Sequence, residues 1–92
     1  MVWIVKYRNT KVIEKTVSKM RQSVRRAFVQ AVMDLKEQGP RPRGWIVKQL
    51  HGKYSDLVCL KLDYRHRMIY SVFSDTVTIE IIEVSTRENA YK

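Results

Sequence analysis

Hydrophobic and polar residues alternate in three segments of the second half of the chain, Leu57–Leu62, His66–Phe73 and Val77–Val84. Alternation rich in β-branched and aromatic residues is typical of strands that bury one face. The short polar segments 63–65 and 74–76 lie between them and predict chain reversals. The three segments are therefore expected to form neighbouring antiparallel strands.

Because successive side chains of a strand point to opposite faces, the alternation assigns residues to two sides of this sheet. One side is expected to be apolar, and the other to carry Lys61 and Arg67. The apolar side comprises Val58, Leu60, Leu62, Met68, Tyr70 and Val72, and the second side Cys59, Lys61, Arg67, Ile69, Ser71 and Phe73. In the last segment, Ile82 and Val84 fall out of phase with Val77, Ile79 and Ile81. This predicts a β-bulge, or an end that is covered on both sides.

The first half of the chain predicts a strand followed by helices. Val2–Tyr7 alternates loosely, and Asn9 or Thr10 can cap the helix that follows it. A second apolar stripe with helical spacing ends at Gly39 and Pro40, which suit a helix terminus. The members of the stripe are Val24, Phe28, Ala31, Val32 and Leu35. A break is expected near Ser18–Met20, because one helix over 10–38 would be ~44 Å long.

The remaining segments complete an α+β prediction. Arg41–Gly44 is a loop, and Trp45–Leu50 fits either a short strand or a single helical turn. Two helices are then expected to form a hairpin that covers an antiparallel sheet of about four strands. At 92 residues the chain forms one domain, 1–92, because two cores of this size could not both bury enough surface.

Composition narrows the class of protein. A hydrophobic fraction of 45% argues against disorder, and no apolar run approaches the roughly 20 residues that span a bilayer. The first residues, MVWIVKYR, do not form a secretory signal. The single cysteine, Cys59, excludes an internal disulfide framework and a multi-cysteine zinc site. A reduced cytoplasmic protein without a membrane segment is expected.

The charge balance points to a polyanionic partner. The chain has 18 Lys and Arg residues against 9 Asp and Glu residues, a net charge of +9. Such an excess on a small domain favours phosphate backbones. A generically basic surface without a specific partner is the alternative.

No cofactor or metal motif is present. The sequence lacks GxxxxGK[ST], GxGxxG and HExxH, and its two histidines have no further ligands at metal-binding spacing. A nucleophilic pair of Cys59 and His66 is conceivable, but a lone cysteine on a strand is usually a packing residue. Neither a cofactor nor a metal is therefore predicted.

The candidate chemistry lies in a set of cations and a tyrosine: Lys61, Arg67, Arg87 and Tyr91, with Lys53 nearby. This set suits RNA cleavage by attack of the ribose 2′-oxygen on its own phosphate. That reaction needs proton transfer and positive charge around the phosphorus, both of which lysine, arginine and tyrosine can supply. The alternative is that these cations form the solvated face of a sheet.

Three segments resemble the RelE/ParE toxin superfamily: KQLHGKYSDLVCLK (48–61), YRHRMIY (64–70) and EVSTRENAYK (83–92). With the strand and helical hairpin before them, the resemblance covers nearly the whole chain. It implies a first strand, two antiparallel helices and a curved antiparallel sheet, in agreement with the patterns above. It also implies a small acidic antitoxin that wraps the toxin in a hetero-oligomer.

The resemblance implies a role for each site residue. RelE-type members cleave mRNA in the ribosome, and by motif Lys61, Arg67 and Arg87 would stabilise the phosphate. Tyr91 would stack on a base or transfer a proton. One position departs from the pattern, since some RelE enzymes have a lysine where this chain has Cys59. His66 or Lys53 could take over its role.

Two other functions stay open. ParE-type members poison DNA gyrase and lack the RNase residues, and a degenerate toxin would be a non-catalytic module that binds nucleic acid or its antitoxin. The ending with Arg87 and Tyr91 favours the RNase branch. Further basic residues are candidates for ribosomal RNA contacts, with plain solubility as the alternative: Arg21, Arg25, Arg26, Arg41 and Arg43, besides Lys53.

Overall fold

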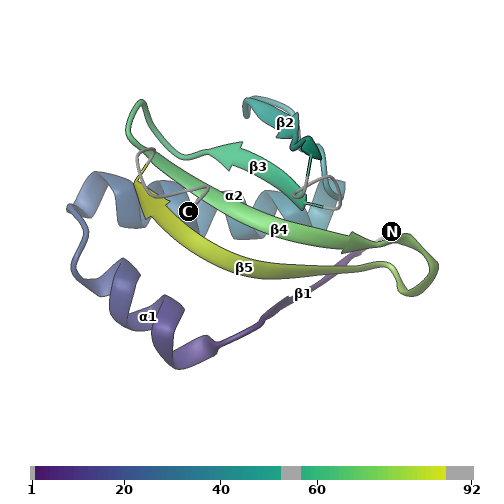
Figure 1. Ribbon diagram of the computed structural model, residues 1–92, viewed down its shortest axis with the longest axis horizontal. Coiled ribbons are helices and arrows are strands. Elements are labelled where there is room, and N and C mark those ends of the chain that lie inside the picture. Colours follow the sequence, from purple (N-terminus) through teal and green to yellow (C-terminus); the bar gives the residue numbers. More distant parts are fainter. Residues whose placement is uncertain (1, 53–56, 87–92) are drawn as a thin grey trace.

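The computed structural model describes residues 2–52 and 57–86. The elements are β1 (Ile4–Tyr7), α1 (Thr10–Ser18), α2 (Gln22–Gln38), β2 (Val47–Gln49), β3 (Leu57–Lys61), β4 (His66–Phe73), a 3-10 turn (Ser74–Thr76) and β5 (Thr78–Thr86). The helix α2 lies across one face of the sheet, and α1 contacts both α2 and β5 (Figure 1). The α+β prediction, with a helix pair packed on a sheet, is confirmed.

The sheet has five strands in the order β1-β5-β4-β3-β2. The pairs β2–β3, β3–β4 and β4–β5 are antiparallel, as predicted for the last three strands. The ambiguous segment Trp45–Leu50 contains the short strand β2, which forms one edge. The strand β1 forms the other edge and runs parallel to β5, so the sheet is mixed and not wholly antiparallel.

Strand boundaries differ slightly from the prediction. The first strand begins at Ile4 and not at Val2. Val77 has a positive φ of 50° at the end of the 3-10 turn, so β5 begins at Thr78. It continues beyond Val84 because Ser85 and Thr86 still pair with β4. Leu62 leaves β3 at the reversal, where its N–H donates to the carbonyl of His66.

The predicted bulge lies in β5. Ile69 pairs with Glu83, whereas Tyr70 pairs with Ile81, so Ile82 is an extra residue without a partner in β4. The extra residue shifts the alternation by one position. Ile81 and Val84 therefore both face the core, which explains the phase change seen in the sequence.

The helix termini follow the sequence cues. The side chain of Asn9 accepts a hydrogen bond from the N–H of Val12 at 3.1 Å and caps α1. The helices are separated at 19–21, close to the expected break, and α2 ends at Gly39, whose φ is 90°. In the part of the chain that the structure describes, no helix is long and apolar enough to cross a membrane.

The main core lies between the sheet and the helices. The predicted stripe of α2 is buried in full: Val24, Phe28, Ala31, Val32 and Leu35. It packs against the predicted apolar side of the sheet, including Leu60, Met68 and Tyr70. A second, smaller apolar cluster of Leu50, Cys59 and Ile69 lies apart from this core. By strand alternation Cys59 and Ile69 belong to the opposite side, which we call the outer face.

Candidate functional site

Two cations lie directly opposite each other on the outer face. Lys61 at the end of β3 pairs with Arg67 of β4, and Arg67 pairs on its other side with Ser85 of β5. Directly opposed residues of an antiparallel pair point to the same face, about 5 Å apart. The sequence prediction that Lys61 and Arg67 share a face is confirmed, and the register shows in addition that they are immediate neighbours.

Within residues 2–52 and 57–86, neither cation of this pair forms an ion pair with a carboxylate. The two ion pairs within the described segments join Arg8 to Glu80 at 3.3 Å and His66 to Asp63 at 2.9 Å. The register puts Glu83 near Arg67 on the outer face, but its described hydrogen bond comes from the hydroxyl of Ser85 at 2.9 Å. Because like charges placed opposite each other are destabilising, an anionic ligand would relieve their repulsion.

Arg67 is partly buried, and one atom of its guanidinium, Nε, has no acceptor in the part of the chain that the structure describes. This atom is shielded from solvent. The apolar neighbours Cys59 and Ile69 are each only 3% exposed, so they provide a poorly hydrated floor beside the cations. Electrostatic attraction is stronger where water is excluded. The arrangement therefore favours a phosphate or another compact anion.

His66 is held at the start of β4 by Asp63. One carboxylate oxygen of Asp63 accepts hydrogen bonds from the N–H of Arg65 at 2.8 Å, the N–H of His66 at 2.7 Å and Nδ1 of His66 at 2.9 Å. Partial burial acts to raise the pKa of Asp63, but these bonds and the nearby imidazole lower it below its ordinary value. The network orders the reversal between β3 and β4.

The side chain of His66 does not lie on the outer face with Lys61 and Arg67. His66 precedes Arg67 in the strand, so its side chain leaves on the side of Met68. The prediction that His66 could replace the missing lysine at Cys59 is therefore not supported, and neither is a Cys59–His66 pair. Among the described residues, no three His, Cys, Asp or Glu side chains gather as metal ligands.

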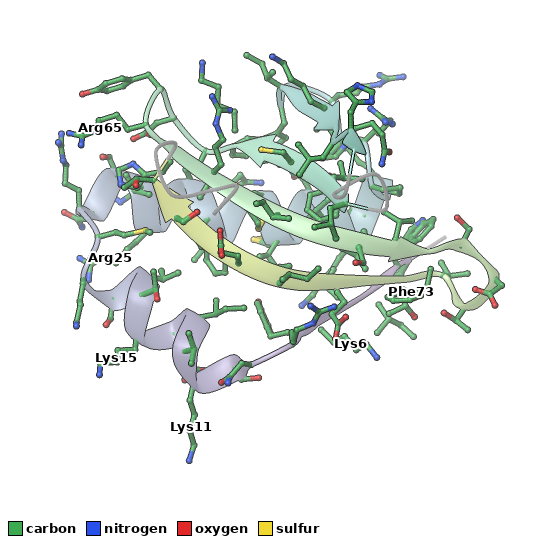
Figure 2. All side chains as sticks on the ribbon, viewed as in Figure 1. Lys6, Lys11, Lys15, Arg25, Arg65 and Phe73 are labelled. Atoms are coloured by element: carbon green, nitrogen blue, oxygen red, sulfur yellow. The ribbon has the colours of Figure 1, made fainter. Side chains whose placement is uncertain are left out.

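The other predicted RNA-binding residues in the described segments lie at the two ends of α2. Arg25 and Arg26 lie near the start of α2, on the helix-covered side, and Figure 2 shows Arg25 projecting from that end. Arg41 and Arg43 follow the other end of α2, beyond Gln38, where they line a shallow cleft. The two pairs are separated by the 12 helical residues 27–38, a length of about 18 Å.

Three predicted site residues lie outside the described residues. These are Lys53, Arg87 and Tyr91. Their roles stay predictions.

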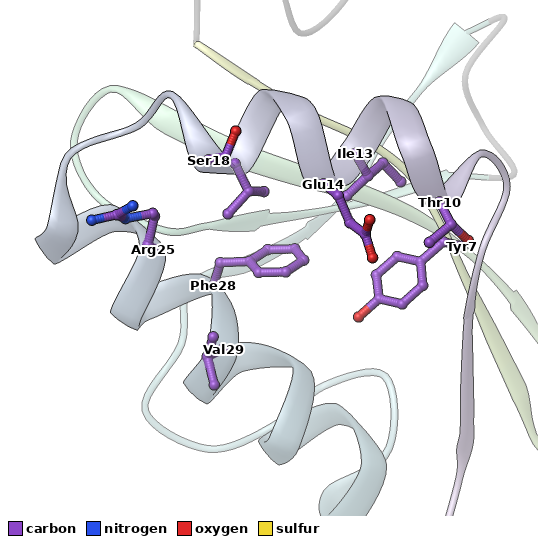
Figure 3. A pocket seen from close by; sticks show the side chains of 9 residues that line it. Tyr7, Thr10, Ile13, Glu14, Ser18, Arg25, Phe28 and Val29 are labelled. Carbon is purple, nitrogen blue, oxygen red and sulfur yellow. The ribbon is translucent and has the colours of Figure 1, made fainter.

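A cleft between the two helices was not foreseen from the sequence. It has a volume of about 390 Å³ and is lined by Tyr7, Thr10, Ile13, Glu14, Val17, Ser18, Arg25, Phe28 and Val29 (Figure 3). Tyr7 and Phe28 approach with their ring centroids 6.4 Å apart. Burial, and secondarily the charge of Glu14, raise the pKa of Tyr7. In the sequence, Val29 is an apolar residue outside the predicted stripe of α2, and in the structure it is 56% exposed on the side of this cleft.

This chain resembles known proteins in its structure. No protein-family model and no curated protein matches the sequence. The solved archaeal RelE–RelB complex from Pyrococcus horikoshii contains a chain that is 24% identical, with a TM-score of 0.76; the match covers 98% of this chain and 100% of that one. A chain of the RelBE2 toxin–antitoxin complex from Mycobacterium tuberculosis is 18% identical, with a TM-score of 0.73 and coverage of 95% and 100%.

A third similar structure has a lower sequence identity. The YoeB/ParE toxin from Agrobacterium tumefaciens is 12% identical, with a TM-score of 0.73, and the match covers 91% of this chain and 98% of that one. At these identities the likeness is one of architecture, and it extends over almost the whole chain. The resemblance predicted from the sequence motifs is thus confirmed in the fold: this chain has the α+β fold of the RelE and YoeB/ParE toxins.

Proposed function

We propose that this protein is the toxin of a type II toxin–antitoxin system and that it cleaves mRNA bound in the ribosome. The observation that carries the proposal is the cross-strand pair of Lys61 and Arg67 on a partly desolvated face, where neither cation forms an ion pair with a carboxylate of the described segments. The toxin structures that share the fold support the toxin class. A ribosomal target implies action in the cytoplasm.

The proposed reaction is an internal transfer at the phosphate. The ribose 2′-oxygen attacks the adjacent phosphorus and gives up its proton to a base, while the bond to the 5′-oxygen of the next nucleotide breaks. That oxygen takes a proton and leaves, so the products are a 2′,3′-cyclic phosphate and a 5′-hydroxyl. Lys61, Arg67 and Arg87 would stabilise the charge on the phosphorane, and Tyr91 would stack on a base or transfer a proton.

We propose that an acidic antitoxin neutralises the toxin. Two of the solved relatives are complexes of a toxin with its antitoxin. The net charge of +9 favours an acidic partner. The cleft between α1 and α2 suits an amphipathic segment of that partner, because its wall is mainly apolar and Arg25 lies at its rim. A second shallow depression, which shares Arg25 and Val29, adds Arg26 to this rim.

The experiment is induction of the protein in bacteria with primer extension on several mRNAs. The variants are Lys61→Gln, Arg67→Gln and Arg87→Ala, and Lys11→Gln on α1 is the control with the same change in charge. We expect growth arrest with new mRNA cuts in the parent and the control. Loss of one phosphate-stabilising group is expected to reduce cutting by about 10²-fold.

The other outcomes identify other functions. Growth arrest without mRNA cuts, unaffected by Arg87→Ala and Tyr91→Ala, would overturn the RNase proposal and favour gyrase as the target. No arrest at all would leave a non-catalytic module that binds nucleic acid or the antitoxin.

A further inference from the structure

We infer that Lys48 is an additional phosphate-binding residue and that it extends the cationic outer face onto the edge strand β2. The inference rests on the proposed function, because it assigns the path of the same RNA ligand. Lys48 lies in a segment whose secondary structure the sequence left ambiguous. Its position relative to Lys61 becomes visible only in the strand register.

The register puts Lys48 on the same face as the other two cations. Lys48 pairs with Cys59 in the antiparallel β2–β3 ladder. Cys59 lies two positions before Lys61 in β3, on the outer face, so the side chain of Lys48 leaves on that face too. Lys48 and Lys61 are then diagonal neighbours, roughly 7–8 Å apart at the backbone.

The three cations form a line across adjacent strands. Arg67 belongs to β4, Lys61 to β3 and Lys48 to β2, and these strands are consecutive neighbours in the sheet. Acidic residues do not interrupt the line in the register, since Cys59 is opposite Lys48 and Lys61 is opposite Arg67. Neither of the ion pairs formed by the described residues involves any of the three.

This line suits a polyanion better than a single anion. A lone phosphate bound between Lys61 and Arg67 would not contact Lys48, whose charge would still be repelled by that of Lys61. A single RNA strand that crosses β4, β3 and β2 carries a phosphate on each nucleotide, so it can contact the cations in turn. Lys48 is exposed on an edge strand, where its long side chain can adjust to the backbone of the ligand.

Edge protection is the competing explanation. A lysine on a short edge strand also prevents the edge from pairing with another chain. That role requires only a charge at the edge and predicts no effect on RNA affinity. The two explanations therefore differ in what happens when Lys48 loses its charge.

The test is the salt dependence of RNA binding. The probe is a fluorescent 2′-O-methyl oligouridylate, which has no free 2′-hydroxyl and cannot be cleaved by the proposed reaction. Binding is measured by anisotropy over a series of salt concentrations for the full chain and for Lys48→Gln, Lys48→Arg, Lys61→Gln and Lys11→Gln. Figure 2 shows Lys11 projecting from α1 away from the sheet, so Lys11→Gln is the matched control.

Each outcome decides the inference. Loss of one contact to single-stranded nucleic acid is expected to reduce the slope of log K against log salt by about 0.7. We expect that reduction in Lys48→Gln, with the parent slope in Lys48→Arg and Lys11→Gln. An unchanged slope in Lys48→Gln, with a reduced slope in Lys61→Gln, would overturn the inference and leave the proposed function intact. An unchanged slope in Lys48→Gln and in Lys61→Gln would overturn the inference together with the proposed function. Self-association of Lys48→Gln, with the same slope as the parent, would establish edge protection.

Discussion

The phenolic hydroxyl of Tyr70 donates a hydrogen bond to the carbonyl oxygen of Pro40, 30 positions earlier in the chain. Tyr70 is fully buried in the middle of β4, and Pro40 begins the loop that follows α2. The bond therefore attaches the end of the helix to the centre of the sheet. Burial raises the pKa of Tyr70, against the influence of Arg41, so the hydroxyl stays a donor even at an alkaline pH where an exposed tyrosine would ionise.

Replacing Tyr70 by Phe tests how much this attachment contributes. Tyr70→Phe keeps the ring in the core but leaves the Pro40 carbonyl without its donor. We expect the free energy of unfolding to fall by about 1 kcal/mol, as for loss of one hydrogen bond. Urea denaturation measures the difference, and a variant as stable as the parent would show that the bond contributes nothing.

Gly39 and Gly44 offer a matched pair in the same loop. Both have positive φ, 90° and 86°, so alanine would be strained at either position. A Cβ at Gly39 would lie 2.9 Å from Nε1 of Trp3, whereas a Cβ at Gly44 would meet open space. We expect the free energy of unfolding of both variants to fall by about 1 kcal/mol, because alanine is strained at a positive φ. Gly39→Ala should lose more than Gly44→Ala.

Thermal unfolding of the two variants measures the difference. Gly39 has a ψ of −165° as well as a φ of 90°, a region essentially restricted to glycine, so the larger loss in Gly39→Ala combines this backbone strain with the contact with Trp3. Equal stability of Gly39→Ala and Gly44→Ala would contradict the prediction.

Asp63 gives a prediction for acid pH. Its pKa is lowered in the folded protein relative to the ordinary value of 3.8, so its ionised form stabilises the fold above that pH. This contribution is lost as the pH falls through the lower, folded pKa. Asp63→Asn keeps an acceptor oxygen at the turn but removes the charge.

We therefore expect the parent to be more stable than Asp63→Asn at neutral pH. The free energies of unfolding of the parent and the variant should converge as the pH falls below the pKa that Asp63 has in the folded protein. Urea denaturation from neutral pH to about pH 2 measures the convergence. A stability difference that is constant over this range would assign the effect of Asp63 to hydrogen bonding alone.

The charge of Lys61 is expected to lower the stability of the fold while it serves mRNA cleavage. Its charge lies opposite Arg67, so Lys61→Gln removes a repulsion of roughly 0.2–1 kcal/mol. We expect the variant to unfold at a higher temperature than the parent at low salt, while it loses mRNA cleavage. The gain should shrink as salt is added, because salt screens exposed charges. A destabilised Lys61→Gln would mean that the lysine contributes to the fold.

The features that the sequence predicted correctly depend on local periodicity. The apolar stripe from Val24 to Leu35 and the alternation around Leu60 and Met68 each determine which side of an element is buried. The phase change at Ile82 predicted the bulge for the same reason. Such patterns act over a few residues and need no knowledge of the partner.

The features that could not be predicted from the sequence depend on contacts between distant segments. The parallel direction of β1 and the pairing of Lys48 with Cys59 follow from how strands meet, which no local pattern records. The partnership of His66 with Asp63 and the cleft beside Phe28 appear only after the chain has folded. Arg25 and Arg41 looked equivalent in the sequence, although the length of α2 separates them.

The parallel pairing of β1 with β5 has a consequence for biosynthesis. In the sheet formed by the described residues, β1 pairs with β5, so β1 leaves the ribosome long before the backbone groups of β5 have been made. The strands β3, β4 and β5 can form their meander from adjacent sequence, whereas closure of the β1 edge is a high-contact-order step. A nascent chain halted before Thr78 would therefore carry an unpaired strand at its amino-terminal side, an aggregation-prone edge for chaperones to shield.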